Sequence, residues 1–209
     1  MTIPFFASQF ERSLACYGSR MSTHEPSQAA IASQYTQFLL NEPEAFERSN
    51  TYGHFTGSSF VIDPYAARVL LTHHAKYLSW NQLGGHCDGI RDPFFVAWKE
   101  SYEEGGLKQI VPASMDIFDL DVHVIPEYKG VKEHYHFDVR YLFLADSSEG
   151  FVKSEESIDL AWVDLGQVRD YSATDSMLRL EFKAIQYLSL NYGFRPPSYY
   201  KPPAGADER

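Results

Sequence analysis

The chain has 209 residues, 44% of them hydrophobic and 22% charged, which is enough to bury a core and ordinary for a soluble globular protein. Its formal net charge of −10 argues against a protein that binds duplex nucleic acid through a basic surface. An acidic chain can still bind a phosphorylated small molecule, because a bound divalent cation reverses the local charge.

Cysteine content and hydropathy indicate the compartment. The two cysteines, Cys16 and Cys87, form neither a disulfide framework nor a metal-type pair. The N-terminal segment lacks the basic start and apolar stretch of a signal peptide, and no run approaches the roughly 18 apolar residues of a membrane span. We therefore expect a cytoplasmic protein that does not bind a membrane. Met21 is an alternative start to Met1.

We expect three regions along the chain: an N-terminal tail (1–26), a single domain with an N-terminal helix (27–195) and a Pro-rich C-terminal tail (196–209). Apolar periodicity and turn residues predict the elements of the domain. They are helix 27–46 broken near Pro43, strands 54–63 and 68–74, a glycine-rich loop at 83–89, helix 93–104, strands 117–125 and 134–144, a short strand at 160–163 and helix 174–191.

Strands 117–125 and 134–144 each alternate apolar and polar residues, and the short link between them predicts an antiparallel hairpin. Strands precede, surround and follow one central helix, with no internal repeat. This order predicts an α+β fold of the α/β/α sandwich type, in which a mixed β-sheet is flanked by helices.

The central helix carries an acidic cluster. Glu100, Glu103 and Glu104 stand at i, i+3 and i+4, so their carboxylates share one side, opposite Phe94, Ala97, Trp98 and Ser101. Neighbouring like charges repel each other, whereas a hard divalent cation such as Mg²⁺ would bind to them through oxygen. The alternative is a solvated acidic helix face, which is the commoner explanation of an isolated E-x-x-E-E.

The surrounding segment resembles the Nudix box, which reads G, five residues, E, seven residues, then R-E-U-x-E-E-x-G-U with U aliphatic. Six residues match this box: Gly85, Glu100, Glu103, Glu104, Gly106 and Leu107. Lys99 replaces the arginine and Ser101 an aliphatic residue. Arg91 stands where the family has the glutamate that pairs with the arginine, and Asp88 or Asp92 could substitute for it.

The resemblance covers roughly residues 50–190. Over this range the chain is similar to a bacterial Nudix branch with GGHxDG in its loop and H-x-H-x-D-V-R on a later strand. It implies the Nudix fold and a pyrophosphohydrolase that cleaves a diphosphate linkage in a nucleoside-diphosphate-type small molecule with Mg²⁺ or Mn²⁺. Nudix relatives are frequently dimers, which makes a homodimer possible.

The resemblance also implies roles for individual residues. Glu103 and Glu104 would hold the metal, with Glu100 as a further ligand or base-assisting carboxylate and the Gly85 carbonyl as an additional ligand. Nudix enzymes often recruit one more acid from a loop before a late strand, a position that Glu155 and Glu156 occupy. Ordinary loop surface is the alternative for both.

Histidines gather on the predicted hairpin and loop. His123, His134, His136 and Asp138 lie on the polar faces of the paired strands, and His86 lies in the loop. Histidine is a common transition-metal ligand, so this set could hold a second metal or bind substrate. The alternative is structural support beneath a cleft.

Arg140 shares the polar face of strand 134–144 and could pair with Asp138 or bind a phosphate. For His73 and His74 a structural role is favoured.

Two other functions compete with hydrolysis. An isomerase resembling the isopentenyl-diphosphate isomerases would use a catalytic cysteine, for which Cys87 is the candidate. A non-catalytic nucleotide sensor is the third possibility, although such regulators usually carry a DNA-binding domain that we do not expect here. The substrate is not predicted, because pocket residues lie on variable loops.

Overall fold

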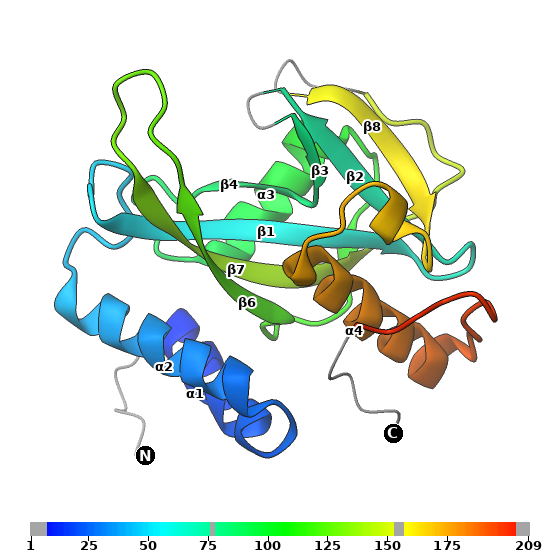
Figure 1. The fold of residues 1–209 in the computed structure, drawn as a ribbon, viewed down its shortest axis with the longest axis horizontal. Helices are drawn as coiled ribbons and strands as arrows, with labels where there is room; N and C mark the ends of the chain where they lie inside the picture. The colour runs from blue at the N-terminus through cyan, green and yellow to red at the C-terminus, as the bar shows by residue number, and fades with distance from the viewer. Residues whose placement is uncertain (1–7, 76–77, 153–156, 204–209) are drawn as a thin grey trace. The chain divides into compact units, whose positions relative to one another are not determined.

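The computed structural model describes residues 8–75, 78–152 and 157–203 (Figure 1). Its helices are α1 (Gln9–His24), α2 (Pro26–Asn41), α3 (Pro93–Gly105), the short 3-10 helix η1 (Val168–Asp170) and α4 (Asp175–Tyr192). Its strands are β1 (Gly53–Asp63), β2 (Arg68–His74), β3 (Ser79–Asn81), β4 (Leu83–His86), β5 (Val111–Pro112), β6 (Asp119–Ile125), β7 (His134–Leu144) and β8 (Ser157–Asp164).

The architecture is α+β, with a mixed β-sheet flanked by helices, as the sequence predicts. The strand order is β3-β2-β1-β7-β5, with β4 next to β1, β6 next to β7 and β8 next to β2. None of the helices in the described part of the chain combines the length and apolarity needed to span a bilayer.

The chain divides into two compact units. The first comprises Met1–Ser58, Gly84–Lys99 and Ser114–Tyr141, and the second Ser59–Leu83, Glu100–Ala113 and Leu142–Arg209. Helix α3 and strands β1 and β7 each contribute residues to both units. The single domain that we expect at residues 27–195 stays a prediction.

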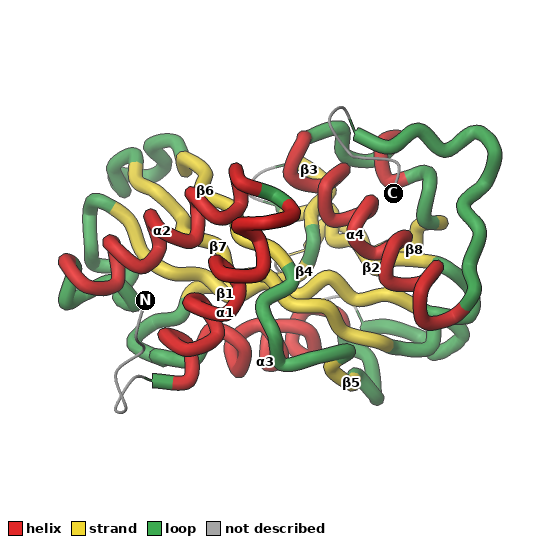
Figure 2. The backbone as a smooth tube through the Cα atoms, turned by 90° about the horizontal axis from the view of Figure 1, so that it is seen from below, coloured by secondary structure: helices red, strands yellow, loops and turns green. Residues whose placement is uncertain are grey.

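An aromatic core fills the first unit. α1 packs on α2, and α2 packs on β6, so that both helices lie in front of the strands in Figure 2. The Phe38 and Phe137 rings stack at 3.9 Å, and Phe55 of β1 contacts both of them. The buried Tyr35 hydroxyl lies 2.7 Å and 2.8 Å from the carbonyls of Asp121 and Asp138, which ties α2 to the hairpin.

The expectation of a tail over residues 1–26 is wrong for Gln9–His24, which form α1. Ser8 caps this helix by accepting from the Glu11 N–H, and the Glu11 carboxylate accepts from the Ser8 backbone N–H in a capping box. Leu14 and Tyr17 are buried, and the Tyr17 hydroxyl donates to Gln28 at 2.7 Å. Packing of this apolar face against α2 stabilises the helix.

The predicted hairpin is confirmed. β6 pairs antiparallel with β7, with Asp119 opposite Arg140 and His123 opposite His136. The polar face of β7 is not solvated as alternation alone would suggest, since His134, His136, Asp138 and Arg140 are all buried. Another difference concerns the predicted glycine-rich loop, whose first four residues form β4.

The second unit has its own core. The end of β1 pairs with β2, and β2 pairs along its length with β8. α4 begins at the cap residue Thr174, which accepts from the Met177 N–H, and ends at Gly193, whose φ is 67°. The inner face of α4 buries apolar residues at helical spacing: Met177, Leu180, Ala184 and Leu188.

Candidate functional site

Helix α3 carries the predicted metal-binding glutamates. Its start is supported by the Asp92 carboxylate, which accepts from the Phe95 N–H at 3.3 Å, and Pro93 stands at its first position. Gly106 follows the helix with φ 58°, a left-handed conformation that favours glycine. The predicted helix and both of its ends are therefore confirmed.

The two faces of α3 differ in part from the prediction. Ala97 and Ser101 are buried as expected, but Trp98 is 37% exposed. Glu104 is only 4% exposed, whereas Glu103 is exposed. Residues 97, 101 and 104 are three or four positions apart, so Glu104 shares the buried stripe of the helix and Glu103 does not.

The carboxylates of Glu100, Glu103 and Glu104 do not form a compact group of ligand atoms. Among the described residues, the group of acidic, histidine or cysteine ligands with atoms within 4.8 Å of one another is His54, His86 and His136. Gly85 belongs to the first unit and Glu100, Glu103 and Glu104 to the second. Glu155 and Glu156 lie outside the described residues. The roles predicted for all six residues stay predictions.

β4 and the loop after it are held by local contacts. Gly84 lies against β1, where an added Cβ would come within 2.9 Å of the Gly57 carbonyl oxygen. Asp88 forms a two-pronged ion pair with Arg48, which lowers the pKa of the Asp88 carboxyl. Asp88 and Asp92 thus have defined partners, and neither is seen to replace the missing glutamate of the motif.

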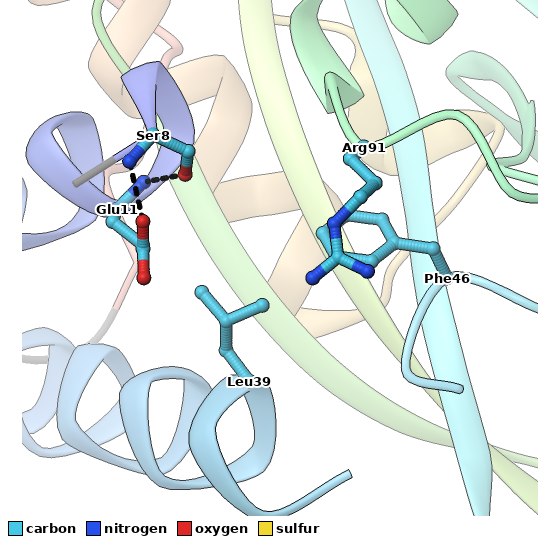
Figure 3. A pocket seen from close by; sticks show the side chains of 5 residues that line it. All are labelled: Ser8, Glu11, Leu39, Phe46 and Arg91. Atoms are coloured by element: carbon cyan, nitrogen blue, oxygen red, sulfur yellow. Dashed lines mark hydrogen bonds between the residues drawn. The ribbon is translucent and has the colours of Figure 1, made fainter. Parts of the chain in front are cut away.

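Arg91, the main departure from the motif, turns toward the N-terminal helices. Its guanidinium carbon lies 4.8 Å from the centre of the Phe46 ring. With Ser8, Glu11, Leu39 and Phe46 it lines an open pocket of about 280 Å³ in the first unit (Figure 3). Arg91 therefore contributes to packing around α1.

Cys87, the candidate nucleophile of the isomerase reading, is fully buried. Its backbone N–H donates to the Phe55 carbonyl at 3.3 Å. A catalytic thiol must reach its substrate, so this burial disfavours the isomerase reading.

Five of the eight histidines form a cluster in the first unit: His54, His86, His123, His134 and His136. The rings of His54, His86 and His136 make a nearly equilateral triangle, with centroids 4.9–5.0 Å apart. These three residues come from adjacent strands, because β1 is hydrogen-bonded to both β4 and β7.

His54 is the member that the sequence analysis did not single out. It is the second residue of β1 and 2% exposed. A single histidine at the start of a strand is a weak signal. Its position relative to His86 and His136 depends on strand pairing, which the sequence pattern alone does not reveal.

The cluster favours neutral imidazoles. Burial, followed by the neighbouring His134, lowers the pKa of His54 to about 4. Burial also lowers the pKa of His136, and His86 and His123 add to that effect. Neutral imidazole is the form that ligates a metal.

Asp138 and Arg140 form a buried network beside this cluster. Asp138 accepts from the hydroxyls of Thr56 and Ser58 and from Arg140 Nε, each at 2.7 Å. Arg140 also donates to Asp119 and Asp121, and the carboxylates of Asp138, Asp121 and Asp119 raise its pKa against the effect of burial. The predicted Asp138–Arg140 pair is therefore present, and a role in substrate binding stays a prediction for both residues.

No protein-family model matches the chain, and no curated protein matches it. A C. elegans Ap4A hydrolase in a binary complex superposes with a TM-score of 0.52 at 18% identity, covering 67% of this chain and 98% of that protein. This likeness shows that the chain has the Nudix fold.

Two other solved structures give lower scores. The E. coli dihydroneopterin triphosphate pyrophosphohydrolase has a TM-score of 0.49 at 12% identity, covering 64% of this chain and 94% of its own. The Nudix domain of Shewanella oneidensis NrtR, complexed with ADP ribose, also has a TM-score of 0.49, at 16% identity, covering 73% and 97% respectively.

Proposed function

We propose that the chain is a Nudix-type hydrolase that uses Mg²⁺ to cleave a diphosphate linkage in a nucleoside-diphosphate-type small molecule. The observation that carries the proposal is the match between motif and structure within the Nudix fold. Glu100, Glu103 and Glu104 stand on one helix that ends at Gly106, and the motif begins at Gly85 in β4. The C. elegans structure with this fold is an Ap4A hydrolase, which supports the same reaction class.

The donor set of α3 fits Mg²⁺. Three carboxylates lie within one and a half turns of helix, and hard carboxylate oxygens are the protein ligands that Mg²⁺ prefers. Glu103 is exposed and therefore accessible to an ion and its substrate. Mg²⁺ at such carboxylates supplies charge neutralisation for the diphosphate oxygens and activation of water.

The chain's own residues would bind and orient the substrate. The glutamates of α3 would hold the ion, and Glu100 would accept a proton from the attacking water. A substrate contact is proposed for the half-buried His123. The buried Asp138–Arg140 ion pair would hold the neighbouring polar side chains of the hairpin in place.

A substrate panel tests the proposal. Purified protein is incubated with Mg²⁺ or Mn²⁺ and with ADP-ribose, NADH, dinucleoside polyphosphates, nucleotide sugars or dNTPs, and the phosphate products are measured. We expect turnover of at least one compound. Glu103→Gln and Glu104→Gln should each lower it at least about 100-fold, because loss of a direct ligand should exceed the 10–100-fold typical of outer-shell partners.

Glu127→Gln is the matched control, since Glu127 is an exposed glutamate of the β6–β7 connection. It should leave turnover unchanged. Circular dichroism should verify that the Glu104→Gln variant folds, because Glu104 is buried. Persistent turnover in both α3 variants would refute the metal assignment. A protein that binds nucleotides but turns over no member of the panel would favour the sensor reading.

A further inference from the structure

We propose that His54, His86 and His136 bind one divalent transition-metal ion, such as Zn²⁺, through one ring nitrogen each. This site is separate in chemistry and residues from the carboxylate site proposed on α3. Imidazole nitrogens favour zinc, copper, iron or nickel over Mg²⁺, which prefers oxygen.

The geometry is close to that of a three-histidine site. The available ligand atoms of the three residues lie within 4.8 Å of one another. Zinc–nitrogen bonds of about 2.0–2.1 Å at tetrahedral angles would separate the nitrogens by roughly 3.3 Å. The nitrogens would therefore have to approach one another by up to about 1.5 Å, which we expect from rotation of the rings about their side-chain torsions.

The second observation is the state of the buried nitrogens. In the described part of the chain, the Nε2 atom of His136 has no hydrogen-bond partner. Neither ring nitrogen of His54 forms a hydrogen bond of ordinary geometry, although the Asn50 carbonyl lies near enough to raise the pKa of His54. His54 is 2% exposed and His136 is 8% exposed. Buried polar atoms are nearly always satisfied in folded proteins, so poorly satisfied ring nitrogens on two neighbouring buried histidines point to a missing ligand. A metal ion would use the lone pairs that these imidazoles offer.

The neighbouring histidines are oriented as expected around such a site. His134 Nδ1 lies 2.7 Å from the Lys132 carbonyl, which can only accept, so Nδ1 is the donor. His123 Nδ1 lies 3.1 Å from an Asp121 carboxylate oxygen. An ionised carboxylate can only accept, so Nδ1 of His123 is then the donor as well. Donation from one ring nitrogen to a carbonyl or carboxylate is the usual support of metal-bound histidine.

A bound metal ion would also offset the unfavourable burial of the histidine rings. Ring contacts join the five imidazoles, and the buried Nε2 atom of His136 is left without a hydrogen-bond partner. A divalent cation would convert this arrangement into a set of strong bonds, and it would cross-link β1, β4 and β7 at one end of their pairing.

Metal titration of the untagged, full-length chain tests the inference. The protein is stripped with a chelator and titrated with Zn²⁺ in competition with a chromophoric chelator, and in parallel with Co²⁺ as a spectroscopic probe. We expect one tight site per chain and the intense visible bands of four-coordinate Co²⁺. His54→Gln, His86→Gln and His136→Gln should each weaken binding at least about 100-fold, since they remove direct ligands.

Two controls separate the outcomes. His73→Gln alters a histidine that stacks on Trp80 in the second unit and should leave Zn²⁺ affinity unchanged. Glu103→Gln should also leave it unchanged, so the zinc result does not depend on the proposed hydrolase activity. His86 is half-buried, so its variant should fold even if His54→Gln does not, as circular dichroism will show. Absence of a tight site, or affinity equal in wild type and the three cluster variants, would overturn the inference and leave a purely structural histidine cluster.

Discussion

Arg140 and Asp138 are two residues apart on β7 and form a buried ion pair, with Nε donating to the carboxylate at 2.7 Å. Both side chains point to the same face of the strand, because successive residues alternate. Their side chains are 4% and 2% exposed. Arg140 is also 3.4 Å from Asp119 and 3.2 Å from Asp121, so one guanidinium serves three carboxylates.

Removal of this guanidinium should be costly. Arg140→Met would leave three inward-facing carboxylates without their shared cation, and we expect it to lower the free energy of unfolding by about 3–5 kcal/mol. Urea denaturation measures the change. Arg68→Met is the control, because the Arg68–Asp164 pair is about half exposed and should contribute less than about 1 kcal/mol. Equal losses in both variants would contradict the role of burial.

Acid stability should depend on Asp63. Burial raises the pKa of this carboxyl, but hydrogen bonds from Ser147, Ala66 and Tyr65 outweigh burial and place the pKa below its usual 3.8. A lowered pKa in the folded state stabilises the protein above about pH 4, and the contribution is lost as pH falls through the folded-state value. Asp63→Asn should therefore destabilise at pH 7 by about 1–3 kcal/mol and less at pH 2–3. Thermal unfolding across this range would contradict the prediction if the difference did not shrink.

The two adjacent glycines at the end of α3 should respond differently to alanine. Gly106 has φ 58°, and an added Cβ would meet the backbone of Val152. Gly106→Ala should cost more than the roughly 1–2 kcal/mol of a left-handed alanine. At Gly105 an added Cβ would meet only the side-chain ends of Leu83 and Leu70, at 3.1 Å and 3.3 Å. Gly105→Ala should thus be the milder change, and the reverse order of melting temperatures would disprove this account.

Restoring the family glutamate at Arg91 should not stabilise the protein. Arg91→Glu would remove the contact with the Phe46 ring, worth about 0.5–1 kcal/mol, and place a second acid toward Glu11. Arg91→Lys keeps the positive charge and should lose less. Melting temperatures of the two variants test this order. An increase in stability for Arg91→Glu would instead indicate that the new glutamate pairs with Lys99 as in the family motif.

Local pattern was sufficient for much of the architecture. The helix from Pro93, the hairpin of strands 117–125 and 134–144 and the final helix follow from periodicity and from Pro, Thr and Gly at the element ends. The Nudix fold followed from the motif residues between Gly85 and Leu107. These features are encoded by neighbours in sequence, since a helix face or a strand face repeats within a few residues.

Other features required the tertiary structure. The sequence pattern did not predict α1, whose buried residues pack against α2. Glu104 is buried, whereas Glu103, one residue earlier, is exposed. His54, His86 and His136 come together from three strands, although His54 and His136 are 82 positions apart in the sequence. Strand register and the packing of distant segments decide such contacts, so the amino-acid order determined which chemical groups the protein has, and only folding determined which of them meet.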